Sequence, residues 1–286
     1  EGYSPASIVI DSPIIFKQKE DAFDKWKPVN FEKKFYGPTS IRTALTHSRN
    51  IVTVKLLQNI GVNRAVQMAQ DLGITSTLEK NLSIALGSSG VTLMEITSAY
   101  SAFANRGERI SPIAVRLIED RNGELLYSAQ PHVSQPISSG MAYTITSLMQ
   151  SVVQNGTATK VKVLNRPIAG KTGTTNNNVD AWFIGFTPGV VTGVWVGKDN
   201  YEQLGKNETG SRAAIPIWLQ YMDYVLQGKP VQNFPVSNEV LFSKTNPATG
   251  EKANFGDPEA QFEVFIDGNI PKREEAEIDS VKDEAF

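Results

Sequence analysis

The sequence predicts a mixed fold of the α+β or α/β class, in which an antiparallel sheet is flanked by helices and preceded by an all-helical half. Two observations lead to this prediction. Apolar residues recur at helical spacing in four successive segments between positions 41 and 104. Three strand-like runs follow at 168–174, 181–187 and 190–198, and Pro188-Gly189 is a turn between the last two. Because short turns join neighbouring strands in antiparallel pairs, we expect one antiparallel sheet next to the helical half.

The helical half carries start and stop signals for each of its segments. The first helix opens after Gly37-Pro38-Thr39-Ser40, where a hydroxyl can cap, and the second ends at Gly61. We expect Asn63 to cap the third helix. Its expected buried face consists of Ala65, Val66, Met68, Ala69 and Leu72. The fourth helix begins with a capping box, in which Thr92 is followed three residues later by Glu95.

The second half begins with strands. Asn122-Gly123 predicts a tight hairpin between two short runs of alternating residues. Ser138 and Ser139 then open a long helix that Gly156 stops, and the three strands of the sheet follow it. Residues 213–226 form a closing helix with Trp218 inward.

The composition changes after this closing helix, which predicts a boundary. From Lys229 onward, Pro, Asn, Gly and acidic residues dominate, and residues 273–284 are rich in charge and poor in apolar side chains. We therefore divide the chain into a main domain, residues 1–228, and a C-terminal appendage, residues 229–286. We expect the end of this appendage to be a disordered tail.

Bulk composition excludes several classes of function. The formal net charge is −2, so there is no basic excess to neutralise nucleic-acid phosphates. With 0 cysteines and 2 histidines, and no acidic residues at ligand spacing, we expect neither a metal site nor a cofactor. Gly170-Lys171-Thr172 resembles the end of a phosphate-binding loop but lacks the leading glycines, which disfavours an ATPase. No apolar run reaches the roughly 20 residues of a membrane span.

The residues best suited to chemistry lie in one run, Lys171-Thr172-Gly173-Thr174-Thr175. A candidate partner strand follows it at Asp180-Ala181-Trp182-Phe183. Side chains alternate along a strand, so Lys171 points to one face while Thr172 and Thr174 share the other. Gly173 would let a ligand approach the backbone closely, and the two threonine hydroxyls could donate to a carboxylate. The competing interpretation is a strand entering a turn with a solvated lysine; the length of the run and its partner strand favour the site.

Other motifs accompany this run in a fixed order. They are Tyr3-Ser4-Pro5-Ala6-Ser7, Trp26-x-Pro28-x-Asn30, Gly37-Pro38, Ser48-Arg49-Asn50, Ala99-Tyr100-Ser101-x-Phe103-Ala104 and Pro216-Ile217-Trp218. With them the sequence resembles the transpeptidase domain of class A (bifunctional) penicillin-binding proteins, from residue 3 to about residue 226. Each motif alone is weak, but their order and spacing together are specific.

The resemblance implies a β-lactamase-like transpeptidase fold and a serine-type D-Ala-D-Ala transpeptidase that cross-links the stem peptides of peptidoglycan. A D-Ala-D-Ala donor would acylate a serine, and an amine of a neighbouring stem would attack the acyl-enzyme. β-Lactam antibiotics would inhibit the intact enzyme covalently. It also implies a bacterial inner-membrane protein of cell-wall synthesis, cell shape and antibiotic resistance, with this domain on the periplasmic side. A membrane anchor and a glycosyltransferase domain are expected outside the chain.

The resemblance also implies roles for the residues of the two motifs. Ser48 would relay a proton to the leaving amine, and Lys171 would orient Ser48 and attract the substrate carboxylate. Thr172 and Thr174 would bind that carboxylate, and the backbone N–H of Thr174 would belong to the oxyanion hole. Asn50 would bond an amide of the donor peptide.

Gly173 and Thr175 complete the substrate-binding segment. Helix capping is the competing role for both Ser48 and Asn50, and Arg49 between them is expected to be structural. Asp180 either fixes the loop after Thr175 or is an ordinary turn acid. His47 and His132 are the only histidines, which favours a lysine-based mechanism over a Ser-His-Asp triad.

The sequence departs from the family at one point. The nucleophile of these enzymes is the serine of a Ser-x-x-Lys motif, and no Ser-x-x-Lys occurs in the 286 residues. We therefore expect the chain to be a fragment that begins just after the nucleophile, with that motif within a few tens of residues upstream of Glu1. Two alternatives stay open: a D,D-carboxypeptidase or β-lactamase, in which water replaces the amine, and a non-catalytic module that binds peptide or β-lactam.

Overall fold

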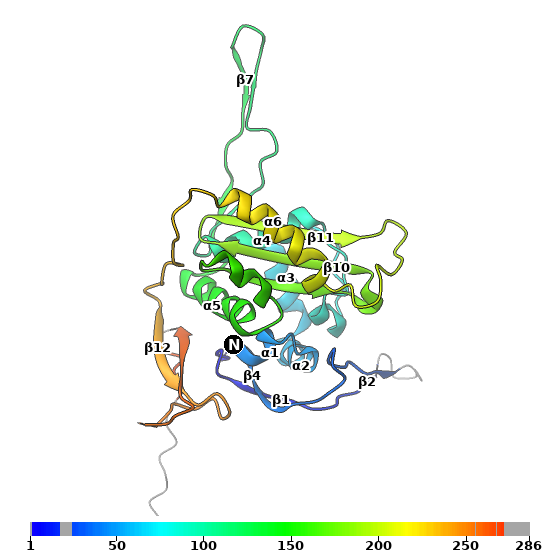
Figure 1. The fold of residues 1–286 in the computed structure, drawn as a ribbon, viewed down its shortest axis with the longest axis vertical. Coiled ribbons are helices and arrows are strands. Elements are labelled where there is room, and N and C mark those ends of the chain that lie inside the picture. Colours follow the sequence, from blue (N-terminus) through cyan, green and yellow to red (C-terminus); the bar gives the residue numbers. More distant parts are fainter. Residues whose placement is uncertain (1, 18–24, 255, 267, 272–286) are drawn as a thin grey trace, which may run out of the picture.

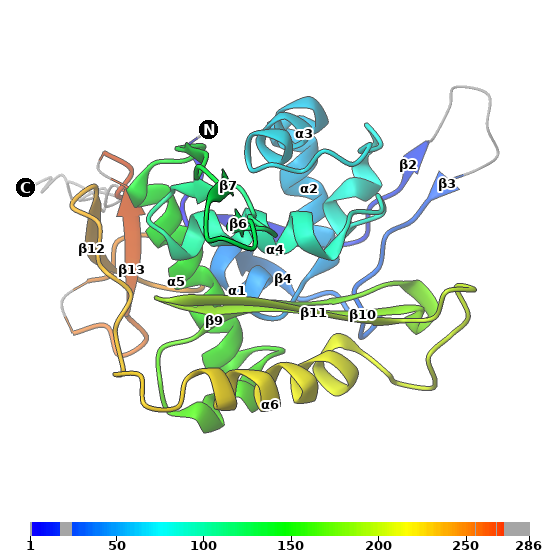
Figure 2. The ribbon, with the colours of Figure 1, turned by 90° about the horizontal axis from the view of Figure 1, so that it is seen from above.

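The computed structural model describes residues 2–17, 25–254, 256–266 and 268–271. Its centre is a three-stranded antiparallel sheet with helices on both faces (Figures 1 and 2). The strands, in the order β11-β10-β9, are β9 (Ala169–Thr174), β10 (Asp180–Thr187) and β11 (Val190–Gly197). The three strands expected from sequence are thus confirmed, and β9 occupies an edge of the sheet.

The helical half lies over one face of this sheet, and the closing helix α6 lies over the other (Figure 2). Its elements are α1 (Ile41–Thr46), α2 (Asn50–Ile60), α3 (Val62–Asp71), the 3₁₀ helix η1 (Leu82–Leu86) and α4 (Leu93–Ala104). The long helix α5 (Ser139–Asn155) packs against both α1 and β9, and a 3₁₀ helix η2 (Thr159–Leu164) follows it. A π-helical segment η4 (Gly210–Ala214) leads into α6 (Ile215–Val225).

Alternating side chains of β10 build a core on each face of the sheet. Phe183 packs edge-to-face against Trp218 of α6, with ring centroids 5.1 Å apart, and both side chains are fully buried. Phe186 belongs to the other core and packs edge-to-face against Phe234 at 5.6 Å and against Tyr100 of α4 at 6.5 Å. The sheet is therefore held rigidly between two apolar layers, which fixes the position of its edge strand.

Helix capping follows the sequence prediction closely. The hydroxyl of Ser40 accepts from the backbone N–H of Thr43 and caps α1, and Ser138 caps α5 in the same way. Thr92 and Glu95 form the complete capping box at the start of α4. Gly61 and Gly156 end α2 and α5 as expected.

Two predictions about α3 were wrong. Asn63 does not cap it: Gly61, at φ 90°, both ends α2 and precedes α3, so Asn63 lies inside the helix. Of the expected apolar face only Val66 is fully buried; Ala65, Ala69 and Leu72 are half-buried, and Met68 is exposed. The helix packs on α2 at the outside of the molecule, away from the sheet (Figure 2), so a narrow stripe is enough to hold it.

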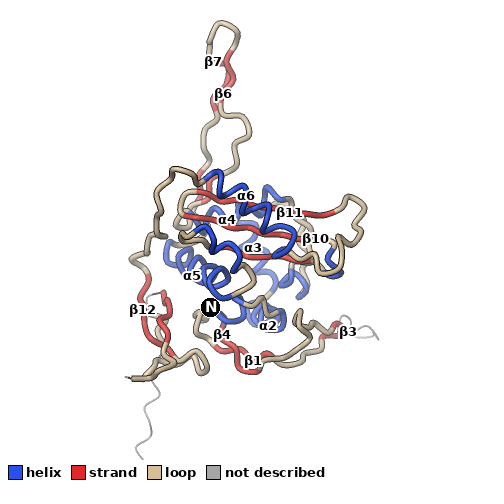
Figure 3. Tube along the Cα trace, in the orientation of Figure 1, coloured by secondary structure: helices blue, strands red, loops and turns tan. Residues whose placement is uncertain are grey.

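Short antiparallel strand pairs lie outside the central sheet. They are β1 (Ile8–Asp11) with β4 (Gly37–Ser40), β2 (Phe16–Lys17) with β3 (Lys25–Trp26), β5 (Arg109–Ile110) with β8 (Val133–Ser134), and β6 (Leu117–Glu119) with β7 (Leu125–Ser128). The β6–β7 hairpin stands away from the rest of the protein (Figures 1 and 3), and all residues of its two strands are exposed. The predicted turn at Asn122-Gly123 lies at its tip.

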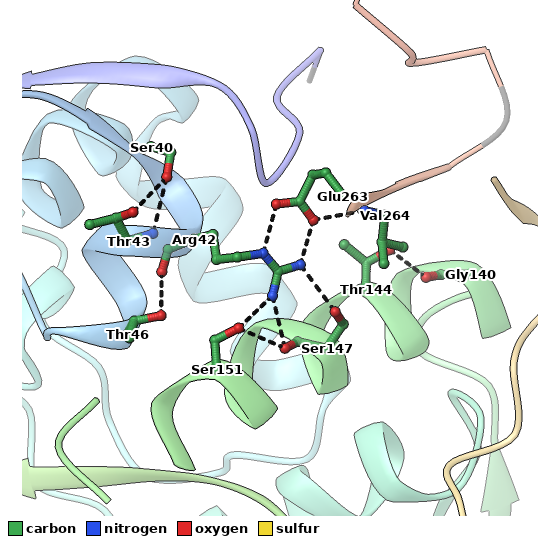
Figure 4. A network of polar contacts seen from close by, with 10 residues as sticks. All are labelled: Ser40, Arg42, Thr43, Thr46, Gly140, Thr144, Ser147, Ser151, Glu263 and Val264. Carbon is green, nitrogen blue, oxygen red and sulfur yellow. Dashed lines mark hydrogen bonds and ion pairs between the residues drawn. The ribbon is translucent and has the colours of Figure 1, made fainter. Parts of the chain in front are cut away.

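The C-terminal appendage is more ordered than its composition suggests. β12 (Val240–Thr245) and β13 (Gln261–Ile266) form an antiparallel pair that packs against α5. Glu263 of β13, which is 5% exposed, forms an ion pair with Arg42 of α1, and Arg42 also donates to Ser147 and Ser151 of α5 (Figure 4). The expected disordered tail lies outside the described residues, and the boundary at residue 228 stays a prediction. In the described part of the chain, no helix is long and apolar enough to span a membrane.

Candidate active site

Ser48 and Lys171 meet at the interface between the helical half and the sheet. The Nζ of Lys171 donates a hydrogen bond to the Oγ of Ser48 at 2.8 Å, although 123 positions separate them in the chain. This is within the hydrogen-bond distance expected for a hydroxyl that relays a proton past a cation. Helix α1 and strand β9 bring the two side chains together, and neither local sequence nor core packing alone demands that contact.

Ser48 lies in the junction between α1 and α2, in a conformation that is unusual for serine. Its φ is 55°, in the left-handed region where an L-residue other than glycine is strained. Its backbone N–H donates to the carbonyl of Leu45 at 3.2 Å, and the next N–H, of Arg49, donates to Ala44 at 2.8 Å. The tight junction therefore holds Ser48 in place instead of leaving it at the end of a freely fraying helix.

Arg49 fastens the junction to the N-terminal part of the chain. Its guanidinium stacks over the ring of Tyr36 at 3.3 Å and forms an ion pair with Glu32 at 3.0 Å. The residue is 8% exposed, so both contacts are partly shielded from water. These contacts support the structural role that was expected for Arg49.

Lys171 is the cation of the site. Its Nζ donates to Ser48 and to the backbone carbonyl of Thr172 at 2.9 Å, which holds the ammonium in place. Burial lowers the pKa of Lys171 to about 8, because removing the charged form from water is costly. Lys171 is therefore mainly protonated at pH 7 but close to releasing its proton.

Thr172 and Thr174 point to the other side of β9, and each hydroxyl has a protein partner. The hydroxyls of Thr172 and Thr157 lie 2.6 Å apart, and the Oγ1 of Thr174 accepts from the backbone N–H of Gly210 at 3.1 Å. Because Thr174 accepts in this contact, its own O–H remains able to donate. The predicted alternation between Lys171 and the two threonines is confirmed, and their binding role stays a prediction.

Asn50 is the first residue of α2, and its side chain does not cap that helix. The Nδ2 of Asn50 donates to the backbone carbonyl of Val29 at 2.8 Å. The N–H of Ile51 donates instead to the side-chain oxygen of Asn30 at 3.3 Å. The capping interpretation of Asn50 is therefore wrong. The contact of Asn50 with Val29 ties the loop around Val29 to the Ser48 junction.

Thr175 and Asp180 close the loop between β9 and β10. The N–H of Asp180 donates to the hydroxyl of Thr175 at 2.8 Å, and the N–H of Thr175 donates to the carbonyl of Asp180 at 3.1 Å. The indole of Trp195 donates to the carboxylate of Asp180 at 2.8 Å. Asp180 thus fixes the end of the Lys171 strand, the first of its two expected roles. Gly173 lies opposite Trp182, where an added Cβ would be 3.1 Å from that side chain.

Two residues near the site were not found from sequence. Thr157 comes from the turn after α5, and Gly210 comes from η4; both contact β9 only because the fold brings them there. The sole hint in the sequence is a hydroxyl residue directly after the helix stop at Gly156.

Burial and the neighbouring Arg49 lower the pKa of His47, so its imidazole is neutral at pH 7 and leaves Lys171 as the cation of the site. Among the described residues, no group of three or more His, Cys, Asp or Glu is placed to hold a metal ion.

Comparisons with known proteins agree with this geometry. A model of the penicillin binding protein transpeptidase domain matches residues 2–223. Penicillin-binding protein 1A of Pseudomonas aeruginosa is 34% identical over 323 aligned positions, which cover 94% of this chain and 39% of that protein. The corresponding protein of Aquifex aeolicus is 39% identical, over 78% of this chain and 31% of that protein. The chain therefore spans less than half the length of these relatives.

Solved structures give the same result for the fold. The crystal structure of penicillin-binding protein 1A from Haemophilus influenzae superimposes with a TM-score of 0.88 at 27% identity, over 95% of this chain and 46% of that one. The PonA1 protein of Mycobacterium tuberculosis, in complex with penicillin V, superimposes with a TM-score of 0.70 at 27% identity, over 82% of this chain and 67% of that one. The expected fold is thereby confirmed.

Proposed function

Because this chain belongs to the penicillin-binding protein transpeptidase family, we propose that it supplies part of the active site of a peptidoglycan D,D-transpeptidase. The observation that carries the proposal is the 2.8 Å hydrogen bond from Lys171 to Ser48. A lysine ammonium that donates to the hydroxyl of a serine with a strained backbone is an arrangement suited to moving a proton. Core packing does not require this contact.

The proposed reaction has two steps. In the first, the hydroxyl oxygen of the nucleophilic serine, which this chain lacks, forms an ester with the penultimate D-alanine of the donor peptide. The peptide bond to the terminal D-alanine breaks, and Ser48 passes a proton to its amine as it leaves. The proton of the nucleophilic serine, taken up by the lysine of its Ser-x-x-Lys motif, replaces the one that Ser48 has given. In the second, an amine of a neighbouring stem peptide attacks the ester and forms the cross-link, and the proton that the amine loses returns through Ser48 to the oxygen of the released serine. Ser48 accepts a hydrogen bond from Lys171, so its own O–H remains free to donate.

The remaining site residues bind the donor. Lys171 supplies positive charge for its terminal carboxylate, and Thr172 and Thr174 supply hydroxyl donors. The backbone N–H of Thr174 serves the oxyanion, where loss of one donor typically costs about 3 kcal/mol. Gly173 and Thr175 shape the strand along which the peptide lies, and Asn50 bonds its amide.

The relatives' names support a wider proposal for the whole protein. We propose a bifunctional, class A penicillin-binding protein of the bacterial inner membrane, with this domain on the periplasmic side and a glycosyltransferase domain elsewhere in the protein. Its partners would be peptidoglycan stem peptides, with a D-Ala-D-Ala donor and an amine acceptor. β-Lactams would be covalent inhibitors, as the penicillin V complex of PonA1 suggests by analogy.

Fluorescent penicillin labelling of the full-length protein tests the proposal. We expect a covalent adduct that survives denaturation and persists for many minutes. Rapid turnover of the label would identify a β-lactamase instead. Absence of any adduct would contradict the transpeptidase and leave a module that only binds peptide or β-lactam.

A further inference from the structure

The turn that follows α5 contacts both elements that carry the candidate site. Gly156 lies against the end of α1: a Cβ added to it would be 2.1 Å from the backbone oxygen of Thr46, two residues before Ser48. The next residue, Thr157, places its hydroxyl 2.6 Å from that of Thr172 on β9. One short turn therefore contacts both the end of α1 next to the Ser48 junction and the Lys171 strand.

The glycine is required by this close approach. Its φ of −116° lies outside the left-handed region that favours glycine. A methyl group would collide with the carbonyl of Thr46, which belongs to backbone and cannot rotate away. Because α5 also packs on β9, the collision would push apart the two halves that form the site.

We propose that Thr157 is a positioning residue for carboxylate recognition, acting through the hydroxyl of Thr172; this rests on the proposed transpeptidase function. Two hydroxyls 2.6 Å apart form one hydrogen bond, and the hydrogen of the accepting hydroxyl remains free to donate to another group. When Thr157 donates, Thr172 keeps its own hydrogen for a ligand. A hydroxyl that already accepts one hydrogen bond is also a stronger donor, because the two bonds polarise each other.

The surroundings hold Thr157 without help from its hydroxyl. Ala158 and Val161, the buried residues of the turn and of η2, are both 0% exposed and belong to the main core. The N–H of Ala158 donates to the carbonyl of Val152 at 3.1 Å, which ties the turn to α5. Removing only the hydroxyl of Thr157 should therefore leave the backbone in place, so its effect on the site can be measured separately from folding.

The experiment measures acylation of the full-length protein by two thioester donors that differ at one group. One carries a free terminal carboxylate, and the other carries the methyl ester of that carboxylate. In Thr157→Val, which keeps the shape but not the hydroxyl, we expect the acylation rate (kcat/KM) to fall about tenfold for the carboxylate donor, roughly the effect of one hydrogen bond. For the ester the loss should be below about twofold, since the ester no longer presents the charged oxygen that Thr172 binds.

Two further variants complete the test. Thr157→Ser restores the hydroxyl and should recover most of the rate, while Thr159→Val, an exposed threonine two residues on, should leave both rates unchanged. An equal loss for both donors, or no loss for either, would overturn the positioning role. If the wild-type protein is not acylated by any donor or by penicillin, the transpeptidase proposal fails, and the Thr157 proposal falls with it.

Discussion

Lys171 and Ser48 are joined by a hydrogen bond although one belongs to the edge strand of the sheet and the other to a helix junction 123 positions earlier. Each is held independently. The contacts of Arg49 and the junction backbone fix Ser48, and pairing of β9 with β10 fixes Lys171. The pair is therefore a property of the assembled fold, and perturbing either side should affect chemistry more than stability.

Replacement of Lys171 by alanine should test whether the residue affects the chemistry more than the stability of the protein. The acylation rate of the full-length protein should fall by roughly a hundredfold or more, the scale of a lost electrostatic contact at the reacting centre. Circular dichroism should stay unchanged. Lys162→Ala, which removes an exposed lysine of η2, is the matched control and should keep the wild-type rate. Intact acylation in Lys171→Ala would mean that Lys171 is only a strand residue.

The pH dependence of acylation follows from the lowered pKa of Lys171. Burial lowers this pKa from 10.5 to about 8, so the site loses its positive charge as the pH rises through about 8. We expect the acylation rate to fall over that range. In Lys171→Arg the charge persists to much higher pH, so the rate should be lower but flat between pH 7 and about 9.5. The same fall in the arginine variant would assign the titration to another group.

The lowered pKa of Lys171 also affects stability, which rises with pH over the range in which the acylation rate falls. Between pH 8 and 10.5 the unfolded chain binds the lysine proton more tightly than the folded protein does. The free energy of unfolding contributed by Lys171 therefore rises with pH across this window. A pH rise from 8 to 9.5 should thus slow acylation without any loss of the fold from Lys171, which circular dichroism can check.

The ion pair of Glu263 with Arg42 is a buried polar link between the appendage and the body, beside the packing of Phe234 on Phe186. In Glu263→Ala the guanidinium of Arg42 keeps its serine contacts but loses its counter-charge, at a cost of about 3 kcal/mol. Urea unfolding should show this loss, with a first transition confined to the appendage if the two parts unfold separately. Glu259→Ala, an exposed acid of the same appendage, serves as the control. Equal stability of the two variants would contradict the inferred link.

Glu95 should contribute stability at neutral pH that disappears in acid. Hydrogen bonds from the side chains of Ser76 and Thr75 and from the backbone of Thr92 hold its pKa well below the usual 4.5. Its stabilisation is complete above pH 4.5 and declines as the pH falls below that value.

Glu95→Gln should therefore lower the free energy of unfolding by about 1 kcal/mol or less at pH 7, because water screens these exposed contacts, with a smaller difference at pH 3. Urea titrations at the two pH values measure it, and Glu108→Gln, an exposed acid beyond the end of α4, is the control. A difference that does not depend on pH would rule out the carboxylate as its source.

Much of the fold could be predicted because it depends on local signals. Caps at Ser40, Thr92 and Ser138, glycine stops and the strand periodicity of β9 to β11 all act within a few residues. The buried face of α3 could not be predicted, because a helix on the outside of a domain buries only what its neighbour covers. The β12–β13 pair was missed for a related reason: Glu263 is buried by a partner more than 200 positions away.

In the candidate site, too, features that depend on local sequence could be predicted and those that depend on tertiary packing could not. Alternation along β9 correctly placed Lys171 opposite Thr172 and Thr174, since a strand fixes the direction of each side chain. The contacts of Arg49 support its interpretation as structural. Thr157 and Gly210 were not predicted, because only tertiary packing brings the turn after α5 and the start of η4 against β9, and a hydroxyl directly after a helix stop is a weak signal.

The β6–β7 hairpin makes this protein suitable for labelling. Its tip at Asn122-Gly123 lies far from the sheet (Figure 1), and Gly123 has φ 84° with nothing within 4 Å of an added Cβ position. Exposed turns of this kind tolerate inserted sequence, because no buried contact or core hydrogen bond depends on them. A fluorescent tag or affinity peptide grafted between these two residues would report where the protein is in the cell while Ser48 and Lys171 remain undisturbed.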